Sequence, residues 1–491
     1  MANGGIIGTV NTPTSTTATG VWQQEEQYEA KVTDTWPQRT LFTTKSLRFN
    51  RGSSDNLSRT KGTSTSTTKG TYSFWFKLSK TTGLTLIENG TAAADRAIVY
   101  IQSDSTLKLF SKIGNSTKLD LGTNRVFRDT SAWYNVVISI DTTQGTDTNR
   151  VKLYVNGTQE TSFASSTYPA QNDALRFFTS SEIEEIGIDF ENGGLFDGYM
   201  SEVIKIDGQQ LAPTSFGVTN SDGVWTPIIY SGTYGNNGFN LQFENAAALG
   251  TDSSPNGNTF TVNNLTSIDQ STDYPVVNYA TLNPLATGSL ITLSEGNLKA
   301  TGNNASDSST TTATIGITSG KFYWETKIVN IVSGYPYLGI YKDFDSLVQG
   351  NLQGGATGDR VMTVYIAGGS TTLVKPGTNL TITAPANDNI IMFAVDKDNN
   401  KFYMGVNGTW YNSGNPTSGA TGTGSLADLD ANGVVMFGSH NYNNSAIELN
   451  FGSPSFAISS GNTDGNGYGN FEYAVPSGYY SLNTKNLGEF G

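Results

Sequence analysis

The chain has no cysteine and a single histidine, His440, among its 491 residues. The absence of cysteine excludes disulfides, thiolate metal sites and a cysteine nucleophile. A single histidine excludes a multi-histidine metal centre and leaves only one candidate base for a catalytic triad. Because no G-x-S-x-G motif accompanies it, the simpler interpretation is a strand-end histidine with an ordinary hydrogen bond. We therefore expect no cofactor and no metal site built from cysteine or histidine. Calcium takes oxygen ligands, which are abundant here, but no D-x-[DN]-x-[DN]-G loop is present. We expect the acidic turns to be solvated, with calcium binding as the alternative.

Charged residues are also scarce, at 14% of the chain, against about 25% in typical soluble proteins. The net charge of −13 argues against a nucleic-acid partner, which requires clustered Lys and Arg. No apolar run approaches the roughly 20 residues of a membrane-spanning helix. The N-terminus lacks the basic and apolar regions of a secretory signal, so we expect synthesis and assembly in a cytoplasm, with no membrane span.

The sequence is rich instead in segments where apolar and polar residues alternate with a period of two, the pattern of half-buried strands. Between 41 and 250 the pattern recurs in YSFWFKL (72–78), IVYIQS (98–103), WYNVVISID (133–141) and RVKLYVNG (150–157). Clusters of Gly, Asn and Ser separate these segments, and an Asn-Gly pair in the last one predicts a tight hairpin. Residues 41–250 therefore read as an antiparallel β-sandwich.

Alternation resumes between 291 and 491, for example in KFYWETKIV (321–329), IIMFAVDKDNNKFYMGVNG (390–408) and IELNFG (447–452). The polar DKDNNK string in the second of these predicts a hairpin tip. Residues 251–290 contain three prolines that break strand pairing, so we interpret them as a linker lying as a strap over the first sandwich. The sequence thus predicts an all-β protein with two antiparallel β-sandwich (jelly-roll) domains in tandem.

Residues 1–40 precede the first sandwich and are too few and too polar to bury a core of their own. We interpret them as an extended anchoring segment that becomes ordered on a partner protein, with Trp22, Tyr28 and Trp36 as the anchoring side chains. The alternative is a flexible terminus with no such role.

Several strings are similar to known families. FDGYMSEV (196–203), followed by LAPTSFG (211–217), resembles a laminin G/concanavalin A-like domain. SGKFYWET (319–326) and NDNIIMFAVDKDNNKFYMGVNGTWYNSG (387–414) resemble a SPRY domain. The leader GGIIGTVNTPT, the string NYATLNPL and the end GYYSLNTKNLGEFG are similar to virion structural proteins of tailed bacteriophages, particularly marine ones.

This resemblance implies a virion protein, a tail fibre or fibre-like appendage that attaches to host surface glycans without breaking a bond. One alternative is a capsid fibre, decoration or connector protein with a purely structural role, and another is a glycan-degrading enzyme. The implied partners are other virion proteins, bound through residues 1–40, a host surface glycan, and further copies of the chain. The expectation of a homotrimer rests on analogy with fibres alone.

The enzyme alternative centres on EIEEIGIDFE at 182–191. Laminarinase-type glycosidases share the jelly-roll fold and carry their catalytic carboxylates on one face of a strand. Asp189 and Glu191 match the last two acidic positions of that arrangement, but Gly187 occupies the position of the nucleophile. The missing nucleophile disfavours the enzyme alternative, so we expect no catalysis.

Aromatic and amide side chains in two loops of the SPRY-like unit are the candidate ligand-binding groups. Aromatic rings can pack on the CH-rich faces of sugars, and amides can bind hydroxyl groups. Loops on a rigid sandwich commonly present such contacts. The alternative is that the tryptophan among them closes the end of the sandwich. The candidates are Tyr335, Tyr337, Trp410, Tyr411, Asn412 and Asn415.

Overall fold

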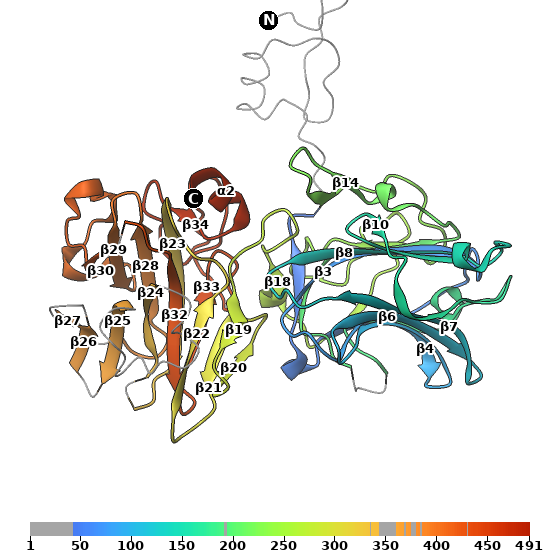
Figure 1. Cartoon of the computed structure of the whole chain (residues 1–491), viewed down its shortest axis with the longest axis horizontal. Coiled ribbons are helices and arrows are strands. Elements are labelled where there is room, and N and C mark those ends of the chain that lie inside the picture. The colour runs from blue at the N-terminus through green and yellow to red at the C-terminus, as the bar shows by residue number, and fades with distance from the viewer. Residues whose placement is uncertain are drawn as a thin grey trace, which may run out of the picture.

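The structure contains two β-sandwiches that lie side by side (Figure 1). Strand pairing is almost entirely antiparallel, so the predicted all-β fold with two antiparallel sandwiches is confirmed. The computed structural model describes residues 43–190, 194–333, 335–342, 360–367, 370–374, 380–382, 385–429 and 431–491.

The first sandwich has two sheets, I and II, that face one another across a core. Sheet I runs in the order β10 (Thr158–Gln159), β9 (Val151–Val155), β8 (Trp133–Asp141), β3 (Lys69–Leu78), β13 (Gly198–Asp207), β1 (Ser46–Phe49) and β18 (Gln270–Ser271), with β16 (Phe239–Leu241) beside β13. Sheet II runs in the order β11 (Phe163–Thr167), β7 (Ser116–Val126), β6 (Thr106–Ile113), β5 (Asp95–Ile101), β4 (Leu84–Ala92), β12 (Ile183–Ile186), β2 (Asn56–Thr60) and β17 (Thr261–Asn263). A separate ribbon pairs β14 (Gly217–Thr219) with β15 (Trp225–Pro227).

The second sandwich is built in the same way from sheets III and IV. Sheet III runs in the order β19 (Leu282–Thr287), β22 (Ser308–Ala313), β32 (Val435–Tyr442), β24 (Tyr337–Lys342), β25 (Arg360–Ala367), β26 (Ser370–Val374) and β27 (Leu380–Ile382). Sheet IV runs in the order β20 (Ile291–Ser294), β21 (Lys299–Gly302), β33 (Ala446–Asn450), β23 (Lys321–Asn330), β28 (Ile390–Asp396), β29 (Lys401–Val406) and β30 (Thr409–Trp410), with β31 (Ala427–Asp428) beside β29 and β34 (Tyr480–Ser481) beside β23.

Helices are short and lie in the connections. None of the helices in the described ranges is long and apolar enough to cross a membrane. They are η1 (Arg51–Ser53), η2 (Asp147–Asn149), η3 (Arg176–Phe178), η4 (Pro213–Ser215), η5 (Ser267–Asp269), η6 (Tyr411–Ser413), η7 (Pro416–Thr421) and the C-terminal α2 (Thr484–Phe490).

Alternation along the strands fills a core in each sandwich. In the first, Phe74 and Phe76 of β3 contribute to a cluster that also contains Leu109 of β6. In the second, Trp324 of β23 stacks on Phe393 of β28 with ring centroids 5.3 Å apart. Full burial of one such side chain is worth roughly 1.5–3 kcal/mol, so these periodic strands supply the driving force for both sandwiches.

Both predicted hairpins are confirmed. Asn156 and Gly157 have φ angles of 48° and 77° and connect β9 to β10. A turn at 397–400 connects β28 to β29, and Asn400 there has a φ of 55°. Asparagine and glycine adopt this left-handed conformation at the lowest cost, which is why the two sites were recognisable from sequence.

Residues 251–290, expected to be a strap, contribute short strands to the first sandwich. β17 and β18 extend the edges of sheets II and I, and β19 of the second sandwich begins at Leu282, nine residues before the expected start at 291. Strands of two or three residues are too short to show alternation, so β17 and β18 could not be predicted from it.

A buried ion pair fastens this strap to the first sandwich. Lys77 Nζ lies 2.8 Å from the Asp273 carboxylate, and the two side chains are 1% and 2% exposed. Trp133 Nε1 donates to the other oxygen of Asp273 at 2.9 Å. Lys77 Nζ also donates to Asn278 Oδ1 at 2.7 Å and to the Tyr279 carbonyl at 3.2 Å. The strap is therefore held by a charge network and not by apolar contact alone.

Polar contacts also connect the two sandwiches directly. Arg48 of β1 donates through Nη1 to the Pro454 carbonyl at 3.2 Å. The Tyr199 hydroxyl of β13 donates to the Gly296 carbonyl at 2.8 Å. Both donors belong to sheet I, so the second sandwich lies against the strands that also bind the strap.

We predict that Asp273→Ala strongly destabilises the protein. The change leaves Lys77 buried without its carboxylate and removes the acceptor of the Trp133 N–H. Loss of one partner of a buried ion pair costs about 3–5 kcal/mol, and urea denaturation of the full chain should show a loss of this size. Asp222→Ala, at an exposed carboxylate, is the matched control. Equal stability of the two variants would contradict the importance of this ion pair.

Candidate ligand-binding site

Sheet II directs a continuous row of side chains away from the core. In the pairing of β4 to β7, Glu88 lies opposite Ile98, Ile98 opposite Phe110, and Phe110 opposite Asp120. Val99, the next residue along β5, belongs to the buried core cluster. Because successive side chains of a strand point to opposite faces, the row lies on the outer face of the sheet.

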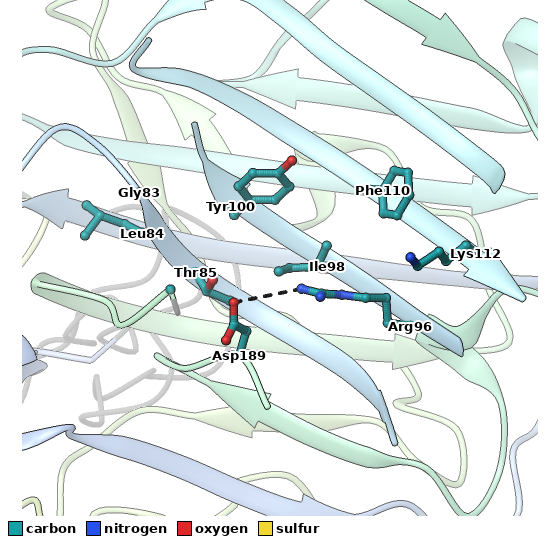
Figure 2. Close-up of a pocket in the computed structure, with 10 residues that line it drawn as sticks. Gly83, Leu84, Thr85, Arg96, Ile98, Tyr100, Phe110, Lys112 and Asp189 are labelled. Carbon is teal, nitrogen blue, oxygen red and sulfur yellow. Dashed lines mark ion pairs between the residues drawn. The ribbon is translucent and has the colours of Figure 1, made fainter. Parts of the chain in front are cut away.

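A hollow of about 330 Å³ lies on this face. Figure 2 shows the rings of Tyr100 and Phe110 on the same face of the sheet, with Arg96 and Lys112 beside them. Both rings are partly exposed, so they present apolar surface to solvent beside charged groups. The hollow is lined by Gly83, Leu84, Thr85, Arg96, Ile98, Tyr100, Phe110, Lys112, Asp189 and Gly194.

Two lysines of β6 flank the Phe110 ring. Lys108 Nζ lies 5.9 Å from the ring centroid and 2.9 Å from the Asp120 carboxylate, with which it forms an ion pair. Lys112 lies opposite Arg96 in the β5–β6 register. Among the described residues, Lys112 has no carboxylate within ion-pairing distance, so its ammonium group is available to a ligand.

Arg96 connects the hollow to two acidic side chains. Its Nε lies 2.8 Å from Glu88 Oε1, and its Nη2 lies 3.9 Å from Asp189 Oδ2. The guanidinium also lies 5.1 Å from the centroid of the Phe190 ring, and the Phe190 N–H donates to Glu88 Oε2 at 2.9 Å. Burial raises the pKa of Glu88 to about 8, against the opposing effect of Arg96. Glu88 is only 1% exposed and does not reach the hollow. It lies on the buried side of Arg96 and positions the guanidinium there.

A glycine lets the loop before β13 approach the hollow closely. The Gly194 carbonyl accepts the N–H of Thr85 at 3.1 Å. A Cβ at position 194 would overlap Thr85 Oγ1 and lie 3.0 Å from Asp189 Oδ2. Any side chain at this position would therefore push the loop, or the two polar groups, out of place.

Gly187, at the position expected for a glycosidase nucleophile, has a structural reason to be glycine. Its φ is 91°, and a Cβ there would lie 2.7 Å from Cδ1 of the buried Phe49. No carboxylate side chain fits at this position. Asp189 contributes to the hollow, whereas Glu191 lies outside the described residues.

Tyr335 and Tyr337, two of the predicted ligand-binding residues, are buried in an aromatic cluster. They are 9% and 2% exposed, and their rings stack with centroids 4.4 Å apart. The Tyr337 ring lies 5.7 Å from the His440 ring. His440 is itself buried, with Nδ1 2.9 Å from Thr310 Oγ1. The two tyrosines therefore offer little ring surface to a sugar.

The other predicted ligand-binding residues lie on sheet IV and the turn after it. Trp410 of β30 is partly buried and packs edge-on against Tyr323, with ring centroids 6.4 Å apart. Tyr411 is 8% exposed and belongs to the second core. Asn412 and Asn415 are exposed, and the Asn415 side chain caps the following 3₁₀ turn. The six candidates are thus divided between two sheets and do not form one site.

The expected anchoring residues Trp22, Tyr28 and Trp36, with the whole of residues 1–40, lie outside the described residues. Within the part of the chain that the structure describes, no group of three or more His, Asp or Glu side chains could hold a metal ion.

Of the residues that line the hollow, sequence reasoning singled out only Asp189, as part of the enzyme alternative. It missed the others, because they come together through strand register and loop approach. Tyr100 and Phe110 lie on strands whose existence alternation predicts, but alternation does not say which strands pair. Asp189 and Gly194 lie in the connection between β12 and β13, which is distant in the chain from β5 and β6. A weak signal was present in β6, where Lys108, Phe110 and Lys112 make its outward-facing row unusually basic and aromatic.

Comparison with known proteins gives a family match within the first sandwich. Residues 51–206 match a laminin G family model described as the concanavalin A-like lectin/glucanases superfamily. The fold of the first sandwich is therefore concanavalin A-like. This agrees with the laminin G resemblance of its sequence, and all the residues that line the hollow fall within the matched range. No curated protein matches the chain.

Solved structures similar to the chain include SPRY domains. The SPRY domain of human HERC1 is 16% identical, with 34% of this chain and 96% of that chain covered, at a TM-score of 0.27. The TRIM65 PSpry domain is 9% identical, with 35% and 88% covered and a TM-score of 0.26. A heptameric SAP-like pentraxin from Limulus polyphemus is 17% identical, with 34% and 77% covered and a TM-score of 0.26.

We predict that Glu88→Gln changes how stability depends on pH. Between its ordinary pKa of 4.5 and about 8, Glu88 stays protonated in the folded state and ionises in the unfolded state. Its contribution to stability is therefore fully present below 4.5 and declines as pH rises toward 8. Urea unfolding at a series of pH values should show the wild type losing stability relative to Glu88→Gln across this window. Glu489→Gln, at an exposed position, is the control, and parallel curves for wild type and Glu88→Gln would disprove the assignment.

Proposed function

We propose that the chain is a glycan-binding protein that holds its ligand in the hollow on the outer face of sheet II and does not cleave it. The observation that carries this proposal is the pair of partly exposed rings, Tyr100 and Phe110, beside Thr85, Lys112 and Asp189 in one hollow. Apolar surface and a few convergent polar groups are the usual composition of small-ligand sites.

The chemistry of the hollow suits a sugar. The CH-rich face of a pyranose ring packs on an aromatic ring, while its hydroxyl groups require donors and acceptors at the edge. Asp189 supplies an acceptor and Lys112 a donor. The volume of about 330 Å³ is near the lower end of small-ligand sites, which measure roughly 300–1,000 Å³, so a short part of a longer glycan is the expected occupant.

Three features support binding without hydrolysis. Glu88, the acidic group beside Arg96, has a raised pKa but is buried, and its oxygens lie against Arg96 and the Phe190 N–H. A general acid must reach the leaving oxygen of its substrate, and Glu88 does not. Gly187 leaves the nucleophile position empty, and Asp189 lies beside the Arg96 guanidinium.

We infer the biological setting from the tailed-phage resemblance of the sequence. The protein is proposed to be a virion component, a tail fibre or fibre-like appendage that attaches to host surface glycans. Residues 1–40 bind other virion proteins, and the chain forms a homo-oligomer. A capsid fibre, decoration or connector protein is the structural alternative, in which the hollow would have no glycan ligand.

A glycan array with the full chain tests the binding proposal. Tyr100→Ala and Phe110→Ala each remove one ring, which we expect to weaken binding about tenfold, equivalent to about 1.4 kcal/mol per ring. Trp410→Ala, at a partly buried ring of the second sandwich, is the matched control. Loss of binding in Trp410→Ala with unchanged binding in the other two variants would move the site to the second sandwich.

Product analysis of the bound glycans separates binding from catalysis. We expect every glycan to be recovered intact after incubation with the wild-type chain. Shortened products that disappear in Asp189→Asn would support the enzyme alternative instead, while an array without any bound glycan would favour a purely structural role.

Cryo-electron microscopy of the particle tests the virion setting. We expect density for the sandwiches in a projecting appendage, with the outer face of sheet II open to solvent. Sandwiches enclosed by neighbouring subunits on a shell or tube, with that face covered, would contradict attachment and favour the structural alternative.

A further inference from the structure

A cluster of polar side chains occupies one end of the first core, where apolar residues are the rule. Asn89 and Glu184 lie on strands of sheet II, and Lys61 directly follows β2 of the same sheet. Tyr72 and Lys205 lie on strands of sheet I. Lys61 is 2% exposed and the other four are fully buried. Glycan binding on the outer face of sheet II makes no use of these groups.

Within this cluster, the Lys61 amine lies against an asparagine amide. Lys61 Nζ is 2.9 Å from Asn89 Oδ1 and also donates to the carbonyl of Arg176 at 2.7 Å. No described carboxylate lies within ion-pairing distance of Nζ. Burial, and then the nearby Lys205 charge, lower the pKa of Lys61 well below its ordinary value, which favours the uncharged, nucleophilic amine.

The nitrogen of the same Asn89 amide is an unexplained feature of the core. Asn89 Nδ2 is buried and has no hydrogen-bond partner among the described residues. Buried amide nitrogens are almost always paired, so an orphan of this kind requires a reason. This nitrogen is also the group that departs when an amine attacks the Asn89 Cγ.

Glu184 and Tyr72 supply a path for the proton that such a reaction moves. Glu184 lies opposite Asn89 in the register of β12 and β4. The Tyr72 hydroxyl donates to Glu184 Oε1 and lies 3.4 Å from Asn89 Oδ1. Although burial opposes ionisation, Lys205 and Arg59 lower the pKa of Glu184 to about 2, so this carboxylate is anionic and can accept a proton.

We propose that Lys61 and Asn89 become joined by an intramolecular isopeptide bond. The lone pair of Lys61 Nζ attacks Asn89 Cγ and forms the new C–N bond. Nζ gives up one proton, which Glu184 and the Tyr72 hydroxyl pass to the departing nitrogen. The bond from Cγ to Nδ2 breaks, and ammonia leaves. The amine and primary amide thus become a secondary amide and ammonia, with no oxidant, metal or other reactant.

Two other buried lysines show why Lys61 is the nucleophile. Lys205 Nζ forms an ion pair with Glu184 at 2.9 Å, and no contact with an asparagine amide is present among the described residues. Lys77 Nζ does lie 2.7 Å from Asn278 Oδ1, but it also forms an ion pair with Asp273 at 2.8 Å. An ammonium group in an ion pair has no lone pair with which to attack. Lys77 is therefore an internal control.

Intact mass spectrometry of the purified full chain tests the proposal directly. The linked protein should be about 17 Da lighter than its sequence, the mass of one ammonia. Because Asn89 is followed by Gly90, cyclisation of the asparagine onto its own backbone could produce the same deficit. The attachment point must therefore be established as well as the mass.

Tryptic peptides establish that point. A bond at Lys61 blocks cleavage there, so a branched peptide should appear in which 60–69 is joined to 81–96 through the side chains of Lys61 and Asn89. Fragmentation of this peptide places the link. A wild-type chain at full sequence mass, or a mass deficit without the branched peptide, would overturn the proposal.

Variants separate the reacting groups from the supporting ones. Lys61→Arg should restore the full sequence mass, because a guanidinium does not attack the amide, whereas Lys77→Arg should keep the deficit. Tyr72→Phe retains the ring but removes the proton path, and we expect the linked fraction to fall at least tenfold in freshly prepared protein. A deficit that persists in Lys61→Arg would assign the loss of ammonia to another site.

Discussion

The alternation of side chains in sheet II is the constraint from which both proposed sites follow. On β4, Glu88 points outward beneath the hollow and Asn89 points inward to the buried cluster, so adjacent residues serve different faces of one sheet. A slip of one residue between β4 and its neighbours would exchange these faces. Glu184, paired with Lys205 and Arg59, opposes such a slip, because separating buried charges from their partners is expensive. The ionic cluster therefore fixes the register on which the outer face depends.

The two sandwiches differ in which outer surface remains open. On sheet IV, the C-terminal segment covers the outer face: Glu325 accepts the N–H groups of Glu472 and Tyr473 at 3.0 and 2.8 Å, and the Tyr323 ring lies 5.1 Å from Phe471. On sheet II, Tyr100 and Phe110 are partly exposed, and no segment among the described residues covers them in this way. The fold thus leaves the first sandwich with the exposed aromatic surface, although the loop aromatics of the second sandwich look more prominent in the sequence.

The sequence alone was sufficient to predict the strands and turns whose pattern is local. WYNVVISID shows its alternation within nine residues and becomes β8, and the turn at Asn156 depends only on the conformational freedom of two residues. The burial of a side chain was harder to predict from the sequence, because its contact partners are distant in the chain. Tyr335 was expected on an open loop, yet a neighbouring tyrosine and a strand from a distant part of the chain cover it. The Lys61–Asn89 contact likewise needs three strands in register before it exists.

The position of β1 has a mechanical consequence. This strand is paired on both sides, with β13 and with β18, and β18 belongs to the strap that Lys77 fastens to the sandwich. A force that pulls on the chain at Thr43, along the direction of β1, is resisted by hydrogen bonds on both edges of the strand at once. Bonds loaded in shear must break together, whereas those of an outer strand peel apart one after another. The point where the chain enters its first sandwich is therefore expected to resist a pulling force strongly.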